Sequence, residues 1–235
     1  MTIHPMTVLV VGATGSIGRL VVDEATREGY SVRALVRNPG KAPELFPGAQ
    51  VVVGDLTHGE TLTAAVDGVD AVVFTLGSDG GKLGAENVDY GGVRNVLRAL
   101  GSRRVRLALM TAIGVTNRTG AYNRATEAHD WKRRSERLVR ASGLPYTIVR
   151  PGWFDYNAPD EHRLVLLQGD RRQAGDPADG GFTGFARRLI YDGRPWRSPC
   201  LSRAINGAIQ SPNPNPEVRA TGAKWLLLRT SLPLR

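Results

Sequence analysis

Residues 128–132, with the sequence AHDWK, bring four side chains capable of chemistry together in one short stretch. An imidazole has an ordinary pKa suited to proton delivery near neutrality, so His129 is a candidate proton donor. His129 lies three residues before Lys132, so on a helix the two side chains share roughly one face. Two interpretations stay open at this point: an active-site helix, or the solvated face of a surface helix.

The neighbours of His129 and Lys132 favour a helix without settling its role. Trp131 is expected to pack in the core, and Asp130 suits a helix start because the helix dipole favours a carboxylate there. The arginines that follow are expected to form a solvated face, which includes the i,i+4 spacing of Lys132 and Glu136: Arg133, Arg134, Arg137 and Arg140.

A glycine motif near the N-terminus points to a second kind of site. Residues 12–18 read GATGSIG, directly after the apolar run TVLVV and before a segment of helical period. Gly12 allows a sharp strand-to-helix turn, Gly15 lets the backbone approach a diphosphate, and Gly18 permits close packing of helix on sheet. The diphosphate would lie at the positive N-terminal end of the helix over residues 16–28.

The ends of the next two strands indicate which dinucleotide fits. A carboxylate after the second strand would bind a ribose 2′-hydroxyl, but this chain has Arg37 there, with Lys41 or Arg33 as helpers. Arg37 can stack on adenine and pair with a 2′-phosphate, which favours NADP(H) over NAD(H). Asp55, which ends the third strand, can meet the adenine amino group or cap a helix, and both interpretations stay open.

The elements that must position these residues alternate along the chain. Short apolar runs, typical of strands buried on both faces of a parallel sheet, are followed by segments of helical period. The pattern predicts a doubly wound, Rossmann-type α/β fold of three layers. Strands are predicted over residues 7–12, 31–36, 50–55, 70–77, 105–111 and 146–152, and helices over residues 16–28, 60–66, 86–100 and about 126–142.

Composition limits the remaining possibilities. The single Cys200 excludes an internal disulfide and a cysteine-based zinc site, which fits a reducing cytoplasm. The N-terminal apolar run is too short for a signal peptide or a membrane span. Of the net charge of +9, a net +7 falls in residues 181–235, so the basic character belongs to that segment and no nucleic-acid or membrane partner is predicted.

Four motifs in this order resemble one known family: GATGSIG, LVRNP, GDL and GLPYTIVRPGWF. The chain is similar to atypical short-chain dehydrogenases/reductases of the NAD(P)H-binding, NmrA-like branch over roughly residues 6–180. The resemblance implies one NAD(P)-binding domain over residues 1–180. Residues 181–235 do not resemble the C-terminal part usual in this family, and this atypical basic segment is expected to fold only in part.

The resemblance also assigns catalytic roles. In the wider superfamily a Tyr four residues before a Lys protonates the carbonyl oxygen, the Lys binds the nicotinamide ribose, and a Ser ends the fifth strand. Lys132 matches the lysine and Thr111 falls near the serine, but Ala128 stands where the tyrosine would be. His129, or Tyr122 folding over from a preceding loop, can replace the missing acid, although each also has an ordinary packing role.

The predicted cofactor contacts follow from the motifs together with the resemblance. They are Gly12, Thr14, Gly15, Ser16, Ile17, Gly18, Arg37, Asp55, Leu56, Thr75, Leu76, Gly77, Lys132, Pro151 and Gly152. The glycine-rich residues 75–92 are expected to form a long loop on the rim of a small-molecule site.

Two functions fit these residues. The first is an NADPH-dependent reductase that passes hydride to a small electron-poor acceptor such as a quinone, flavin, enone or activated carbonyl, with Thr111 hydrogen-bonding the acceptor. The second is an NADP(H)-binding redox sensor that acts through a protein partner. A nucleotide-sugar epimerase would need a larger substrate domain than residues 181–235 supply. The sequence leaves monomer and homodimer open.

Overall fold

A computed structural model describes residues 5–40, 42–78 and 81–151 of the chain. Its centre is one six-stranded sheet in the order β3-β2-β1-β4-β5-β6, and every neighbouring pair of strands is parallel. The strands are β1 (Thr7–Val11), β2 (Ser31–Val36), β3 (Gln50–Val53), β4 (Ala71–Phe74), β5 (Arg106–Met110) and β6 (Tyr146–Val149). The doubly wound, Rossmann-type α/β prediction is confirmed.

The strand order reverses direction between β1 and β4. The chain moves outward from β1 to β2 and β3, then returns to the other side of β1 and continues through β4, β5 and β6. In open α/β sheets ligands bind beyond the carboxyl ends of the strands at such a reversal. The segments after β1 and β4 are therefore where a ligand is expected.

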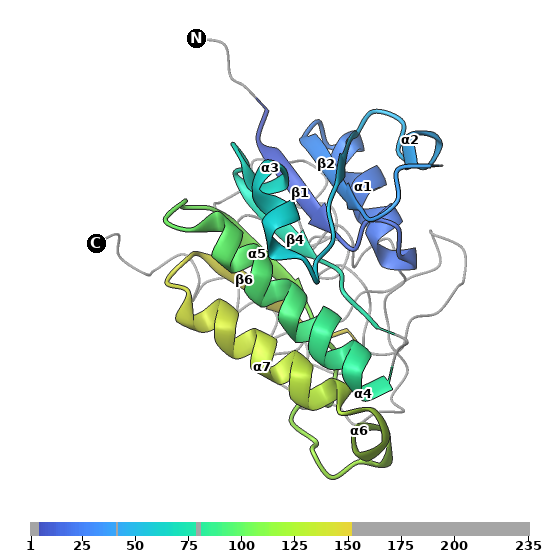
Figure 1. The fold of residues 1–235 in the computed structure, drawn as a ribbon, viewed down its shortest axis with the longest axis vertical. Helices are drawn as coiled ribbons and strands as arrows, with labels where there is room; N and C mark the ends of the chain where they lie inside the picture. Colours follow the sequence, from blue (N-terminus) through green and yellow to red (C-terminus); the bar gives the residue numbers. More distant parts are fainter. Residues whose placement is uncertain (1–4, 41, 79–80, 152–235) are drawn as a thin grey trace, which may run out of the picture.

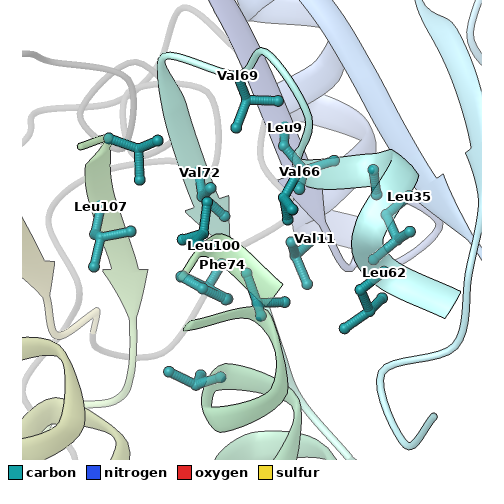
Figure 2. Close-up of a cluster of buried hydrophobic side chains, with 14 of the residues drawn as sticks. Leu9, Val11, Leu35, Leu62, Val66, Val69, Val72, Phe74, Leu100 and Leu107 are labelled. Carbon is teal, nitrogen blue, oxygen red and sulfur yellow. The ribbon is translucent and has the colours of Figure 1, made fainter. Parts of the chain in front are cut away.

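Each face of the sheet has its own hydrophobic core, because alternate residues of a strand point to opposite faces. On one face, Val8 and Val10 of β1 pack with the helix α1 (Ser16–Arg27) and with the short helix α2 (Ala42–Leu45). On the other, Leu9 and Val11 pack with the elements between β3 and β4 and with two long helices. Figure 2 shows the second cluster, with Leu62 and Val66 facing Leu9 and Val11.

The helices on this second face come from three crossovers. The first holds the 3₁₀ turn η1 (Gly59–Leu62) and α3 (Thr63–Val66). The second holds α4 (Gly81–Gly84), the π-helix η2 (Ala85–Gly92) and α5 (Val93–Leu100), and the third holds α6 (Ala121–Thr126) and α7 (Ala128–Ala141). In Figure 1, α5 and α7 run side by side across the sheet.

One prediction about these crossovers was wrong, and one helix was not predicted. The predicted rim loop over residues 75–92 is helical from Gly81 onward, so only its first residues are irregular. The helix predicted over about residues 126–142 is α7, and the separate helix α6 precedes it; the two are divided at Glu127, which has a left-handed φ of 54°. Tyr122 therefore lies on α6 and not in a loop.

The domain boundary predicted at residue 180 and the basic segment over residues 181–235 lie outside the described residues, as does Gly152.

Candidate dinucleotide site

The glycine motif forms a tight turn between β1 and α1. Gly12 has a φ of +87°, a conformation that side-chain-bearing residues rarely adopt, and the N–H of Gly15 donates to the Gly12 carbonyl oxygen at 3.0 Å. A Cβ on Gly12 would lie 2.9 Å from the hydroxyl of Thr75. The turn therefore requires glycine both for its φ and for its contact with the segment after β4.

Gly18 allows α1 to lie against this turn. A Cβ at this position would come within 2.0 Å of the Gly12 carbonyl oxygen, which is a severe clash with backbone. Gly15 is different, since its φ of −69° is open to other residues and the nearest atom to an added Cβ is 3.3 Å away. Gly18 thus serves the packing of helix on strand, whereas Gly15 leaves space above the turn.

The start of α1 is suited to an anion. No side chain caps its N-terminus, no acidic residue lies in its first turn, and Thr14, Gly15 and Ser16 are exposed. Uncapped N–H groups at a helix N-terminus bind phosphate through hydrogen bonds and the dipole. Ile17 points into the core and shapes the helix without offering a polar group.

Arg19 adds a positive charge to this helix start, and the sequence analysis missed it. Its Nε donates to the Thr14 carbonyl oxygen at 3.1 Å, so the guanidinium lies over the glycine turn. The sequence gives little indication of this role, because a cation near a helix N-terminus is unfavourable to the helix dipole.

At the ends of β2 and β3, Arg37 and Asp55 lie close enough to interact electrostatically. Arg37 is exposed. The Asp55 carboxylate accepts hydrogen bonds from the N–H and the hydroxyl of Thr57, both at 2.8 Å. These bonds, the backbone N–H first, lower the pKa of Asp55, and the electrostatic interaction with His58 and Arg37 lowers it further. Asp55 thus closes a local turn, and its predicted contact with adenine stays a prediction.

The segment after β4 connects the glycine turn to the predicted catalytic lysine. The hydroxyl of Thr75 donates to the carbonyl oxygens of Val11 and Gly12, at 3.0 and 3.3 Å. The next carbonyl, that of Leu76, accepts a hydrogen bond from Lys132 at 3.0 Å. Gly77 is exposed, and Leu56 packs against the core below. The structure therefore brings Gly12, Thr75, Leu76 and Lys132 together at the carboxyl edge of β1 and β4.

Lys132 also forms a buried ion pair. Its Nζ lies 2.9 Å from a carboxylate oxygen of Asp89, and the two side chains are only 13% and 2% exposed. Lys132 thus points inward from α7 rather than onto a solvated face.

Thr111 lies directly after β5, and its hydroxyl is used inside the protein. It donates to Glu136 at 2.9 Å, and Thr111 itself is buried. Glu136 is fully buried and also accepts two hydrogen bonds from Arg150, at 2.8 and 2.7 Å, and one from Arg140 at 2.9 Å. Burial opposes ionisation of Glu136, but the bonds from Arg150, Arg140 and Thr111 outweigh it and lower its pKa.

The two candidates for the missing acid contact each other. The rings of Tyr122 and His129 have centroids 5.2 Å apart, and a Cβ on Gly114, in the segment after β5, would lie 3.6 Å from the His129 ring. Tyr122 is 58% exposed. Ala128, where the tyrosine was expected, is buried. The carbonyl of Pro151 accepts a hydrogen bond from Ile113 at 2.7 Å, which joins the ends of β5 and β6.

The prediction that Glu136 belongs to a solvated face was wrong, although Arg134, Arg137 and Arg140 are exposed. Trp131 is only partly buried, because its ring packs between Tyr90, at 5.4 Å, and the guanidinium of Arg134, at 4.1 Å. Asp130 lies in the first turn of α7 as expected and pairs with Arg118 and Arg133.

The sequence analysis also missed Asp89, Glu136 and Arg150, although helical spacing marked two of them. Asp89 lies four and seven residues before the core residues Val93 and Val96, on one apolar stripe. Glu136 lies three residues before the buried Val139, and eight after the buried Ala128. A carboxylate on an inward-facing stripe needs a buried partner, and that requirement was the available indication.

The strand order, the glycine turn and the uncapped start of α1 together define a dinucleotide-binding domain of the Rossmann type. The chain belongs to the NAD(P)H-binding family, whose pattern matches residues 12–179. The predicted resemblance to atypical short-chain dehydrogenases/reductases is thereby confirmed at the level of an NAD(P)H-binding domain.

Curated relatives are about one third identical to this chain over the residues that align. An uncharacterized sugar epimerase of Bacillus subtilis is 34% identical over 154 residues, which are 63% of this chain and 72% of that protein. A photosystem II assembly factor of Cyanophora paradoxa is 34% identical over 164 residues, 69% of this chain and 50% of that protein. The chain thus spans about half the length of some of its relatives.

Solved structures extend the likeness to three dimensions. A putative NAD-dependent epimerase/dehydratase from Bacillus halodurans has a TM-score of 0.66 at 26% identity, and the match covers 77% of this chain and 85% of that one. An NADPH-dependent quinone oxidoreductase from Escherichia coli, solved with NADPH, has a TM-score of 0.52 at 26% identity, with 63% and 49% covered.

Across the part of the chain that the structure describes, no helix combines the length and the apolar character needed to cross a membrane.

Proposed function

We propose that the protein is an NADPH-dependent oxidoreductase that passes hydride to a small electron-poor acceptor, such as a quinone, flavin, enone or activated carbonyl. The observation that carries the proposal is the continuous site from the glycine turn to Lys132, joined by Thr75 and Leu76. A relative in structure, the quinone oxidoreductase of Escherichia coli, is NADPH-dependent. When bound, the reduced nicotinamide supplies the hydride.

The residues around the glycine turn fit the diphosphate. The exposed backbone of Thr14, Gly15 and Ser16 offers N–H groups at an uncapped helix start, and Arg19 brings a positive charge over the turn. In this proposal Lys132 holds the nicotinamide ribose, because its ammonium group is fixed at the carboxyl edge of β4.

The preference for NADPH over NADH depends on Arg37. Its side chain is exposed after β2, where a 2′-phosphate is expected, and a guanidinium can bind phosphate through two parallel hydrogen bonds. Asp55 is already engaged by Thr57, so it is less free to accept from a ribose hydroxyl. Both features favour NADPH in the proposal.

The proton is proposed to come from Tyr122, with His129 beside it, or from solvent. Tyr122 is exposed and its ring contacts that of His129, so a proton lost by the phenol can be replaced through the imidazole. Thr111 is proposed to position the segment after β5 through Glu136 instead of binding the acceptor directly, because its hydroxyl proton is already donated.

A second function is favoured by one observation, the buried Ala128 at the tyrosine position. A protein that binds NADP(H) without turnover and reports redox state to a partner needs no acid there. One relative is named as an assembly factor, which fits a role through partners.

One experiment separates the two functions. Purified full-length protein is mixed with NADPH or NADH and a panel of quinones, flavins, enones and aldehydes, and cofactor oxidation is followed by absorbance. Lys132→Ala is the test variant, and Arg137→Ala, which removes an exposed cation of the same helix, is the matched control.

Turnover that prefers NADPH, falls with Lys132→Ala and persists with Arg137→Ala supports the oxidoreductase. NADPH binding without oxidation by any acceptor supports the sensor. An epimerase would convert a sugar nucleotide with no net consumption of cofactor, and that result would overturn the proposal.

A further inference from the structure

Lys132 is held by two acceptors from different elements. Its Nζ donates to Asp89 Oδ1 at 2.9 Å and to the Leu76 carbonyl oxygen at 3.0 Å. An ammonium group has three N–H donors in a tetrahedral arrangement. With two directions fixed, the direction of the third is fixed as well, so Lys132 presents one donor in a set orientation.

Asp89 is itself fixed from three sides. It lies within the π-helix η2, and its backbone carbonyl accepts a hydrogen bond from the Ser135 hydroxyl of α7 at 2.6 Å. Its second carboxylate oxygen accepts from the Ser78 hydroxyl at 3.2 Å. Asp89 thus connects Lys132 to the segment after β4 and to the body of α7.

The sequence neighbours of Asp89 and Lys132, Tyr90 and Trp131, also contact each other between η2 and α7. Tyr90 packs against Trp131 at 5.4 Å, and guanidinium groups lie over both rings, Arg94 over Tyr90 at 5.8 Å and Arg134 over Trp131 at 4.1 Å. In Figure 1 the helical segment from α4 to α5 runs beside α7. The aromatic pair fixes the spacing of η2 and α7, and with it the position of Asp89 relative to Lys132.

The charge balance gives Asp89 a role beyond packing. Burying an ammonium group without a partner costs folding free energy, and burying a carboxylate without a partner does so as well. The Asp89 carboxylate is 2% exposed and lies on Lys132. Lys132 is therefore held at the site in a neutral pair before any ligand arrives.

We propose that Asp89 is a positioning residue that orients Lys132 for cofactor binding. The inference rests on the proposed function, because Lys132 is taken to hold the nicotinamide ribose. Asp89 does not touch the cofactor in this proposal; it acts only through the ammonium group of Lys132. The π-helix places its carboxylate there.

The test is a double-mutant cycle on NADPH affinity, measured by nucleotide fluorescence with the full-length protein. The variants are Asp89→Ala, Lys132→Ala and the double variant, with Asp89→Asn as the conservative replacement. Thermal unfolding of each variant shows whether it folds. Asp89→Asn keeps the size and one acceptor oxygen, so the question stays answerable if Asp89→Ala does not fold.

A positioning role predicts a specific pattern. Asp89→Ala should weaken NADPH binding about tenfold in the wild-type background and should have no further effect in Lys132→Ala. Asp89→Asn should lose less NADPH affinity than Asp89→Ala, because the amide oxygen of asparagine can still accept a hydrogen bond from the Lys132 Nζ. Acceptor KM should be unchanged, since the defect is in cofactor binding.

If Asp89→Ala lowers NADPH affinity equally in the wild-type protein and in Lys132→Ala, the proposal is overturned, because Asp89 then acts independently of Lys132. An unchanged affinity in folded Asp89→Asn and Asp89→Ala would also overturn it. If the wild-type protein binds no NADPH at all, the proposed function itself fails. If the wild-type protein and the Asp89 variants bind NADPH equally well, only the positioning role of Asp89 fails.

Discussion

Replacing Glu136 by glutamine tests whether the buried cluster behind the site stabilises the fold. The Glu136 carboxylate accepts four hydrogen bonds: one from Thr111, one from Arg140, and two from Arg150, through its Nε and one terminal nitrogen. Glu136→Gln keeps the shape and one acceptor oxygen but removes the charge. It removes the buried carboxylate that pairs with Arg150, which lies directly after β6.

The size of the stability loss in Glu136→Gln depends on how exposed the two arginine partners of Glu136 are. Removing one partner of a buried ion pair costs about 3–5 kcal/mol. The side chains of Arg140 and Arg150 are 43% and 19% exposed, so water recovers part of that loss. We therefore expect the free energy of unfolding to fall by about 3 kcal/mol, which corresponds to a melting temperature lower by about 6–12 °C in a chain of this size.

Urea unfolding followed by circular dichroism measures this loss. Arg137→Ala is the matched control, since Arg137 is exposed on the same helix and forms no ion pair with the described residues; it should stay within about 0.5 kcal/mol of wild type. A Glu136→Gln variant as stable as Arg137→Ala would refute the reasoning that the cluster holds α7 to β5 and β6.

The remaining predictions concern pH and the cofactor. The pKa of Glu136 is lowered in the folded protein, so the ionised carboxylate stabilises the fold fully above about pH 4.3. This stabilisation should disappear as the pH falls through the folded pKa. The difference in free energy of unfolding between wild type and Glu136→Gln, measured by urea unfolding from pH 7 to 3, should therefore become smaller in acid. Gly15→Ala has an allowed φ of −69° and should fold normally, yet its Cβ occupies the space above the turn, so NADPH affinity measured by fluorescence should fall while Gly12 keeps its conformation. Arg37→Ala should reduce the ratio of NADPH to NADH affinity by about tenfold, the loss of one charged hydrogen-bonding partner for phosphate. Tyr122→Phe should lower kcat by about 100-fold for aldehydes, with no change for quinones whose reduced anions are stable; an unchanged kcat for aldehydes in steady-state assays would argue against the phenol as proton donor.

The fold was predictable because strands and helices leave different periods in the sequence. All six strands were predicted within two or three residues at each end, since apolar runs such as TVLVV suit only a sheet buried on both faces. The glycine turn was equally predictable, because Gly12 and Gly18 serve local geometry that neighbouring residues already define. These features depend on contacts close together in sequence or repeated along it.

The helices near the site were harder to predict in detail. The helix predicted over residues 86–100 corresponds to η2 and α5 together, but the glycines at 84, 91 and 92 also indicated a loop there. A π-helix has a wider turn than an α-helix, and the spacing of apolar residues does not show that Ala85–Gly92 forms one. The division at Glu127 has no proline or glycine to mark it. Its left-handed backbone costs about 1–2 kcal/mol, and the side chain pairs with Lys82 at 2.9 Å. Lys82 is 45 residues away, and its proximity depends on the fold.

Lys132 could be assigned to the site from the sequence, but its surroundings could not, because its partners are distant in sequence and meet it only in the fold. Its partners, Asp89 and Leu76, come from the crossover and strand that pack beside α7, and Thr111 and Arg150 reach Glu136 one turn further along the same helix. Helical spacing shows that positions 132 and 136 face inward with Ala128 and Val139, but it cannot show which opposite charges meet them. Because Lys132 and Glu136 are each neutralised by a partner from another element, α7 is fixed at two points one turn apart. The Glu136 cluster fixes the orientation of the helix, and the Asp89 pair fixes the ammonium group, so loss of Glu136 should lower stability first while loss of Asp89 should lower cofactor affinity first.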